Sequence, residues 1–210
     1  MEPWEVTAYV IASVCSSVAT LAAVYLRHKL SAKRKDSIEH ETKHNENVYT
    51  ALNYTLEEMS ADRAYVLEFH NGIHYLSGRG QQKFSCSYEI VQEGISAECH
   101  NSQDHRVSNY HTYISELVEK EKFEYVDVGE MEDHVFAGLL HQKGVKSIYN
   151  VPIKTLNGKI IGILGVDYVK GRAEKGVMGF GADEKNRSRF DEEAYHFMKR
   201  QARIIAGYLL

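Results

Sequence analysis

The segment 146–169 constrains the fold most strongly, because two apolar runs in it are separated by an Asn-Gly pair. The runs are "KSIYNVPI" and "KIIGILGVDYV". Asn157 and Gly158 readily supply the positive φ angles of a tight hairpin turn. We therefore predict that Ser147–Ile153 and Ile160–Val169 pair as antiparallel strands.

Other segments of the chain alternate apolar and polar residues or are continuously apolar, which is typical of strands. Short helices are expected between them at Tyr110–Glu121 and Asp133–Lys143, the second ending on Gly144 as a left-handed cap. The further predicted strands are "RAYVLEF" at 63–69, "KFSCSYEIV" at 83–91 and "EYVDV" at 124–128.

The C-terminal segment Phe190–Leu210 is predicted to be a long amphipathic helix that starts with acidic residues. One face carries Phe190, Ala194, Phe197, Met198, Ala202, Ile205 and Leu209. With the strands, this helix indicates an α+β fold, in which an antiparallel sheet of five to six strands is flanked by helices. We expect the short helices on one face and the terminal helices on the other.

Near the N-terminus, Val6–Leu26 contains no formally charged residue. About 20 apolar residues in a helix cross the hydrocarbon core of a bilayer. Trp4 and Tyr25 fall where aromatic side chains sit at membrane interfaces. We therefore predict one N-terminal transmembrane helix that is not cleaved. A cleaved signal peptide is disfavoured by the acidic start, and a buried core helix is the other alternative.

Basic residues follow this segment, whereas none precedes it. Because the cytoplasmic side of a membrane helix carries the excess of Lys and Arg, the predicted topology places the N-terminus outside and the rest of the chain in the cytoplasm. We expect a single-pass protein of a bacterial or host inner membrane. The flanking residues are Arg27, Lys29, Lys33, Arg34 and Lys35.

The following segment, Ser31–Ser60, is polar, lacks Gly and Pro, and is predicted to be one helix. Two interpretations are open. In one, a coiled-coil seam runs through Ile38, Asn45, Leu52 and Met59. In the other, only Val48–Met59 packs on the following domain and the rest is a solvated stalk.

The overall composition is that of one globular domain with an accessory segment, since the chain has 210 residues, 43% of them hydrophobic. We expect an anchor at 1–30, a juxtamembrane helix at 31–60 and the α+β domain at 61–210. The net charge of -4 and the mixed charges disfavour nucleic acid as a partner. Three cysteines without Cys-x-x-Cys spacing indicate neither a disulfide framework nor a zinc knuckle.

Two segments resemble the second half of a GAF domain: "GVKSIYNVPIKTLNGKIIGILGVDYVKG" and the closing "FDEEAYHFMKRQARIIAGYLL". They share a strand ending in Val-Pro-Ile, a turn, an "IGILGVD" strand and a long terminal helix. The resemblance covers roughly residues 45–210. It implies a GAF/PAS-like sensory module that binds a small ligand between the sheet and the short helices and dimerises through its flanking helices.

Earlier in the chain, "ADRAYVLEFHNG" and "KFSCSYEIVQEGIS" are similar to membrane-tethered, phage-encoded GAF-like proteins. A further resemblance is to the soluble domain of T-even phage holins. Those holins place the basic flank before the membrane helix and export the domain, whereas here the flank follows the helix.

The candidate ligand-binding residues begin on the segment 69–80, which is predicted to be a Gly-punctuated loop. The alternative is a hairpin turn in which Asn71 and Gly72 serve only the backbone. The residues proposed for this loop are His70, Asn71, His74, Tyr75 and Arg79, and Cys86, Glu89 and Asp167 complete the set.

Known GAF ligands are not indicated. The cyclic-nucleotide motif is absent, since Asn186 is followed by Arg187 and Phe190 directly abuts Asp191. No cysteine has a bilin-attachment context. Methionine sulfoxide reductases of this family use several cavity cysteines, a pattern that Cys86 and Cys99 match poorly. We predict no cofactor.

Metal binding and catalysis are also disfavoured. The His and Cys residues match no known metal-site spacing, so surface or packing roles are preferred. In particular, Cys86 is predicted to be a small buried hydrophobe rather than a redox sensor. Asp167 with Glu89 and Glu93 is the best carboxylate set, yet no nucleophile or phosphate-loop motif accompanies it. The metal candidates considered are His70, His74, Cys86, Cys99, His100 and His105.

Two functions follow from the sequence. The first is a membrane-anchored, non-enzymatic sensory or regulatory module that acts as a homodimer and binds a small molecule or a protein. The alternative is a phage holin-like or lysis-timing membrane protein.

Overall fold

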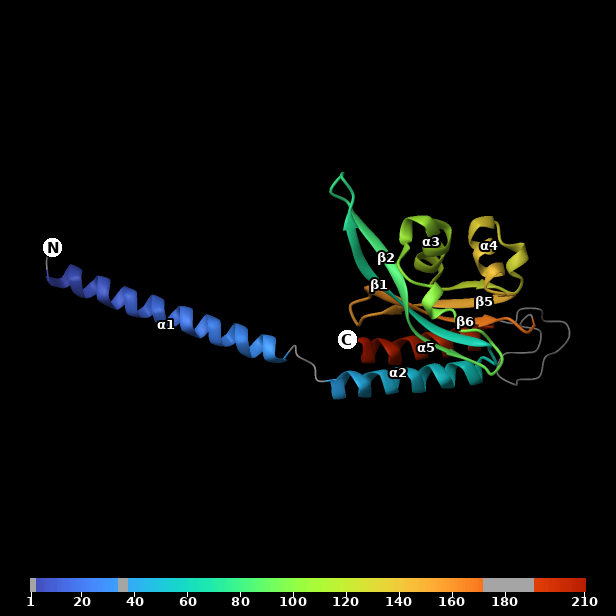
Figure 1. The fold of residues 1–210 in the computed structure, drawn as a ribbon, viewed down its shortest axis with the longest axis horizontal. Helices are drawn as coiled ribbons and strands as arrows, with labels where there is room; N and C mark the ends of the chain where they lie inside the picture. The colour runs from blue at the N-terminus through green and yellow to red at the C-terminus, as the bar shows by residue number, and fades with distance from the viewer. Residues whose placement is uncertain (1–2, 34–37, 172–190) are drawn as a thin grey trace. The chain divides into compact units, whose positions relative to one another are not determined.

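The computed structural model describes residues 3–33, 38–171 and 191–210 (Figure 1). The chain divides into two compact units, Met1–Lys43 and His44–Leu210. The subdivision predicted from the sequence at residues 30 and 60 stays a prediction.

The first unit contains helix α1, Pro3–Lys33. The segment expected to be helical, 6–26, lies within it. Large apolar side chains on this helix are exposed, including Val14, Val18, Leu21 and Val24. Among the residues that the structure describes, no helix has the length and apolar character needed to cross a bilayer.

The second unit is built on one antiparallel sheet of six strands in the order β3-β2-β1-β6-β5-β4. This mixed architecture agrees with the predicted α+β class. The strands are β1 (Arg63–His74), β2 (Gly80–Val91), β3 (His105–Arg106), β4 (Phe123–Tyr125), β5 (Ser147–Lys154) and β6 (Ile160–Tyr168). The helices are α2 (Ile38–Glu58), α3 (His111–Lys120), α4 (His134–Gln142) and α5 (Glu192–Leu209), and the 3-10 turns are η1 (Cys99–Asn101), η2 (Val107–Tyr110) and η3 (Val128–Glu130).

The β5–β6 hairpin is confirmed. Its register runs from Ser147 opposite Tyr168 to Ile153 opposite Gly162. In the turn, the Gly158 N–H donates to the Thr155 carbonyl at 2.9 Å, and Gly158 has a φ of 78°. Glycine adopts this left-handed conformation without the steric cost of a Cβ. The Asn-Gly pair therefore marks the turn correctly, although only Gly158 of the two residues has a positive φ.

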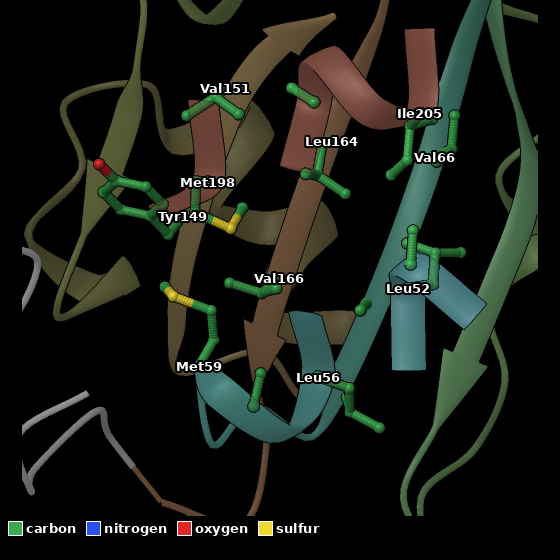
Figure 2. Packing of buried hydrophobic residues seen from close by; sticks show 14 of the residues in the cluster. Leu52, Leu56, Met59, Val66, Tyr149, Val151, Leu164, Val166, Met198 and Ile205 are labelled. Carbon is green, nitrogen blue, oxygen red and sulfur yellow. The ribbon is translucent and has the colours of Figure 1, made fainter. Parts of the chain in front are cut away.

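The helices lie in two layers, with α3 and α4 on one face of the sheet and α2 and α5 on the other (Figure 1). Figure 2 shows the second layer, where Leu52, Leu56 and Met59 point into a core with strand residues such as Leu164 and Val166. The structure therefore favours the interpretation in which Val48–Met59 packs on the domain. The Asn45 carboxamide oxygen accepts a hydrogen bond from the Tyr88 hydroxyl at 2.7 Å.

The predicted helices of the domain are largely confirmed. Helix α4 ends before Gly144, whose φ is 71°. Helix α5 begins after Asp191, whose carboxylate accepts from the Ala194 N–H at 2.8 Å. Of its predicted apolar face, Leu209 is partly buried, and the buried members are Ala194, Phe197, Met198, Ala202 and Ile205. Asn186, Arg187 and Phe190 lie outside the described residues.

Of the two interpretations of the segment 69–80, the structure favours the hairpin over the loop, since β1 continues to His74 and pairs with β2, which begins at Gly80. Asn71-Gly72 therefore lies within a strand, and the turn falls at Tyr75–Gly78, where the Gly78 N–H donates to the Tyr75 carbonyl. The short strand β3 was missed, and β4 ends at Tyr125 instead of continuing to Val128.

Candidate functional site

A cavity of about 60 Å³ lies between the sheet and the helices α3 and α4. One water needs roughly 10–15 Å³ on this measure, so the cavity has room for a few water-sized groups. Its apolar walls include Leu67, Phe84, Phe136, Leu139, Leu140 and Ile148, and its polar lining includes Tyr65, Glu89, Glu98, Ser102, His105, Tyr110, Tyr113, Lys143, Asn150 and Asp167.

Strand register explains why polar groups from separate strands meet at the cavity. Glu89 pairs with Tyr65, Tyr65 pairs with Gly165, and Gly165 pairs with Asn150. These residues form one row across β2, β1, β6 and β5. Asp167 lies two residues beyond Gly165 on β6, so its side chain is on the same face of the sheet.

Gly165 allows the residues of this row to pack closely against one another. A Cβ atom at this position would lie 2.3 Å from both the Asn150 carboxamide oxygen and the Tyr65 ring. No side chain fits there, which is the positional reason for a glycine in the middle of a buried strand.

The Tyr65 hydroxyl is the centre of the polar cluster. It lies 3.0 Å from the Asn150 carboxamide oxygen and 3.0 Å from an Asp167 carboxylate oxygen. The Asn150 amide in turn donates to the Tyr113 hydroxyl at 2.7 Å. Burial raises the pKa of both Tyr65 and Tyr113, so both phenols stay protonated and act as neutral hydrogen-bonding groups.

Asp167 is the buried carboxyl group of the cluster. Its side chain is 7% exposed and lies 3.5 Å from the Arg63 guanidinium. Burial raises the pKa of Asp167 to about 6, although Arg63 and the Tyr65 hydrogen bond act in the opposite direction. Arg63 is itself buried and also donates to the backbone carbonyls of Ser96 and Lys143.

Further polar groups lie around the cavity. Both Glu89 carboxylate oxygens accept backbone N–H groups, at 2.8 to 3.0 Å, from Glu98 and from the next residue. The Lys143 ammonium donates to the Ser102 hydroxyl. Burial lowers the pKa of His105, with a smaller effect of Lys143 in the same direction. The imidazole is therefore neutral at physiological pH.

The structure separates the residues predicted from the sequence into two groups. Cys86, Glu89 and Asp167 line the cavity. The other five, His70, Asn71, His74, Tyr75 and Arg79, lie on the distal part of the β1–β2 hairpin and are not among the cavity-lining residues.

The hairpin residues contact one another or neighbouring strand residues. His70 Nε2 lies 2.9 Å from the Ser85 hydroxyl. The Asn71 carboxamide oxygen accepts from the Gln82 amide at 3.2 Å. The Arg79 guanidinium lies over the Tyr75 ring, 5.0 Å from its centroid. These contacts account for four of the five residues as hairpin packing.

Sequence reasoning missed Tyr65, Asn150 and Lys143. Asn150 carried a usable signal, since it is the polar residue in the otherwise apolar core of "SIYNVPI", and buried polar side chains require a partner. Tyr65 and Lys143 carried none, because their roles depend on tertiary packing. Within the described residues, no group of three or more His, Cys, Asp or Glu residues could hold a metal ion.

Comparisons with known proteins identify the fold. No family model and no curated protein matches the sequence. Among solved structures, the blue-light absorbing form of the PixJ GAF domain of Thermosynechococcus elongatus has a TM-score of 0.56 at 11% identity, covering 82% of this chain and 90% of that chain. The GAF domain region of a protein from Geobacter sulfurreducens PCA has a TM-score of 0.54 at 16% identity, covering 82% and 96%. The chain thus has a GAF-like fold.

Substitution of Gly165 by alanine tests the close packing of the polar cluster. Because the new Cβ would collide with Tyr65 and Asn150, we expect a loss of about 1–3 kcal/mol in the free energy of unfolding, measured by urea denaturation. Gly138→Ala is the matched control. A Cβ at Gly138, in α4, meets nothing within 4 Å, so this change should stabilise by about 0.5–1 kcal/mol. Equal effects of the two substitutions would contradict the described packing.

Proposed function

We propose that the chain is a sensory or regulatory module that binds a small polar molecule in the cavity between the sheet and helices α3 and α4. The supporting observation is the buried cluster of Tyr65, Asn150 and Asp167 at the cavity. Burying a carboxyl group in a protein interior costs free energy that apolar residues would not incur. A cluster of this kind beside a cavity supports a role in binding better than a role in stability.

The size of the cavity limits the ligand. Pockets for drug-sized molecules measure roughly 300–1,000 Å³, whereas this cavity has about 60 Å³. The blue-light absorption of the PixJ domain implies a pigment. A pigment molecule is too large for a cavity of this size. We therefore propose a compound of only a few non-hydrogen atoms.

The charges around the cavity suggest which groups the ligand carries. The Asp167 carboxylate would accept from a cationic or hydrogen-bond-donating group. The Lys143 ammonium would pair with an anionic or accepting group. A small molecule that carries both kinds of group fits this arrangement best.

No catalytic step is assigned to the cavity. Both Glu89 oxygens are engaged by backbone N–H groups. Asp167 can still accept from a ligand, but the sequence has no nucleophile or phosphate-loop motif that would act with it. Non-enzymatic binding is the function that these contacts support.

We further propose that residues 6–26 anchor the chain in a membrane, with the GAF-like domain in the cytoplasm, and that the domain forms a homodimer. The uncharged segment and its basic C-terminal flank support the first part. For the second part, Tyr49, Tyr54 and Ile204 are exposed on α2 and α5, where apolar side chains favour association. The likeness to phage proteins and holins stays a prediction.

Removal of the Tyr65 hydroxyl tests the proposed binding site. A library of small polar metabolites is screened by ligand-induced shift of the melting temperature of the full chain. For a compound that binds, Tyr65→Phe should reduce affinity by roughly 5- to 100-fold, because one hydrogen-bonding group of the cluster is lost.

Tyr168→Phe is the matched control, since it also removes a buried tyrosine hydroxyl but on the α2 side of the sheet, where that hydroxyl donates to the Met59 carbonyl. Tyr168→Phe should bind the compound with the same affinity as the parent chain. If both variants bind like the parent chain, the ligand site lies elsewhere.

The membrane proposal is tested by fractionation of cells that express the full chain. We expect the protein in the membrane pellet, extractable only with detergent. Val14→Arg should move a large share into the soluble fraction, because an arginine near the middle of a membrane helix costs about 2.5–3.5 kcal/mol. Leu76→Arg, a change at an exposed residue of the β1–β2 turn, should not. A parent chain that is soluble without detergent would refute the anchor.

A further inference from the structure

Two of the three cysteines lie next to each other beside the cavity. Cys86 is on β2 and Cys99 begins η1, and both are free thiols. The Cys99 thiol donates to the Cys86 carbonyl oxygen at 3.3 Å. The Cys86 thiol donates to the Tyr88 carbonyl oxygen at 3.3 Å.

Several hydrogen bonds hold the Cys99 segment against β2. The Gln103 side-chain amide donates to the carbonyl oxygens of both Cys86 and Cys99, each at 2.7 Å. The Cys86 N–H donates to the Ser102 carbonyl at 2.8 Å. The Cys99 N–H donates to the Glu89 carboxylate at 2.8 Å. These bonds fix the backbones of Cys86 and Cys99 next to each other.

The two thiols differ in accessibility. Cys86 is 5% exposed and lines the cavity, whereas Cys99 is only partly buried. Burial is the largest cause of the raised pKa of Cys86. Because the thiolate is the reactive species, an external oxidant should react with Cys99 before it reacts with Cys86.

We propose that Cys86 and Cys99 are a modification site at which a hydroperoxide is reduced and an intramolecular disulfide forms. The Cys99 thiolate attacks the peroxide O–O bond, takes one oxygen to become a sulfenic acid, and releases the corresponding alcohol or water. The Cys86 sulfur then attacks the Cys99 sulfur and the S–O bond breaks. The Cys86 thiol proton passes to the departing hydroxyl group, which leaves as water. The two thiols supply both electrons that reduce the peroxide, so no further reagent is needed.

The disulfide would change the cavity. Cys86 is part of the cavity wall, and the N–H of Cys99 is bound by Glu89, which lines the same cavity. Linking the sulfurs would draw η1 toward β2 at this wall. Oxidation would thereby alter the space between the sheet and helices α3 and α4, whether or not a ligand occupies it.

The experiment uses the full chain with Cys15→Ser, because Cys15 is exposed on α1 and would form links between chains. The reduced protein is treated with hydrogen peroxide, alkylated under denaturing conditions and analysed by mass spectrometry. We expect a loss of about 2 Da, two cysteines protected from alkylation, a linked peptide containing Cys86 and Cys99, and full reversal by dithiothreitol.

Two alanine variants in the same background separate the roles of the thiols. In Cys86→Ala, Cys99 should accumulate as the sulfenic acid and be captured by dimedone. In Cys99→Ala, the buried Cys86 should remain alkylatable after the same peroxide treatment. Circular dichroism establishes whether each variant is folded. If a variant is unfolded, the proposal is decided by the linked peptide of the Cys15→Ser chain alone.

Three results would overturn the proposal. The parent chain could stay fully alkylatable, it could form only links between chains, or Cys86 could oxidise as fast in Cys99→Ala as in the parent.

Discussion

The placement of the Tyr65 ring against Gly165 is the constraint on which the cavity side of the domain depends. Tyr65, Gly165 and Asn150 face one another across three adjacent strands. Because Gly165 has no side chain, the ring can lie against the strand and bring its hydroxyl to both Asn150 and Asp167. One missing Cβ atom thus determines how groups that are far apart in the sequence form a single hydrogen-bonded cluster.

The two faces of the sheet differ in the kinds of side chain that pack on them. On the α2 and α5 face, large apolar side chains occupy the interior (Figure 2), and their burial drives folding. On the α3 and α4 face, apolar walls surround a polar centre and a small cavity. Both faces therefore contribute apolar burial to stability, whereas the cavity and the cluster of Tyr65, Asn150 and Asp167 are on the second face.

Features set by local sequence could be predicted, because they need no knowledge of the rest of the chain. The Asn-Gly turn, the left-handed Gly144 and the apolar face of α5 are of this kind. Features set by strand register could not be predicted. The length of β1 depends on its pairing with β2, which places the hairpin turn at Tyr75–Gly78 instead of at Asn71-Gly72.

The candidate site shows the same division between local and tertiary information. Cys86, Glu89 and Asp167 were selected as residues of reactive types on predicted strands, and they line the cavity. Tyr65 and Lys143 were not selected, because only the tertiary structure brings them there. The neighbourhood of Cys86 and Cys99 likewise depends on the fold of the segment between them, so Cys86 looked like an ordinary buried residue in the sequence.

The ionisation of Asp167 tests the central claim most directly, since that carboxyl group is buried at the cavity only if the cluster exists. Its side-chain ¹³C resonance can be followed against pH by NMR in the full chain, with Asp167→Asn to assign the signal. The account predicts a pKa of about 6, above the ordinary value of 3.8. A raised pKa also means that the stability contributed by the protonated form is present below pH 3.8 and is lost as the pH rises through about 6. A resonance that titrates at or below about pH 4, as a solvated aspartate does, would contradict the account.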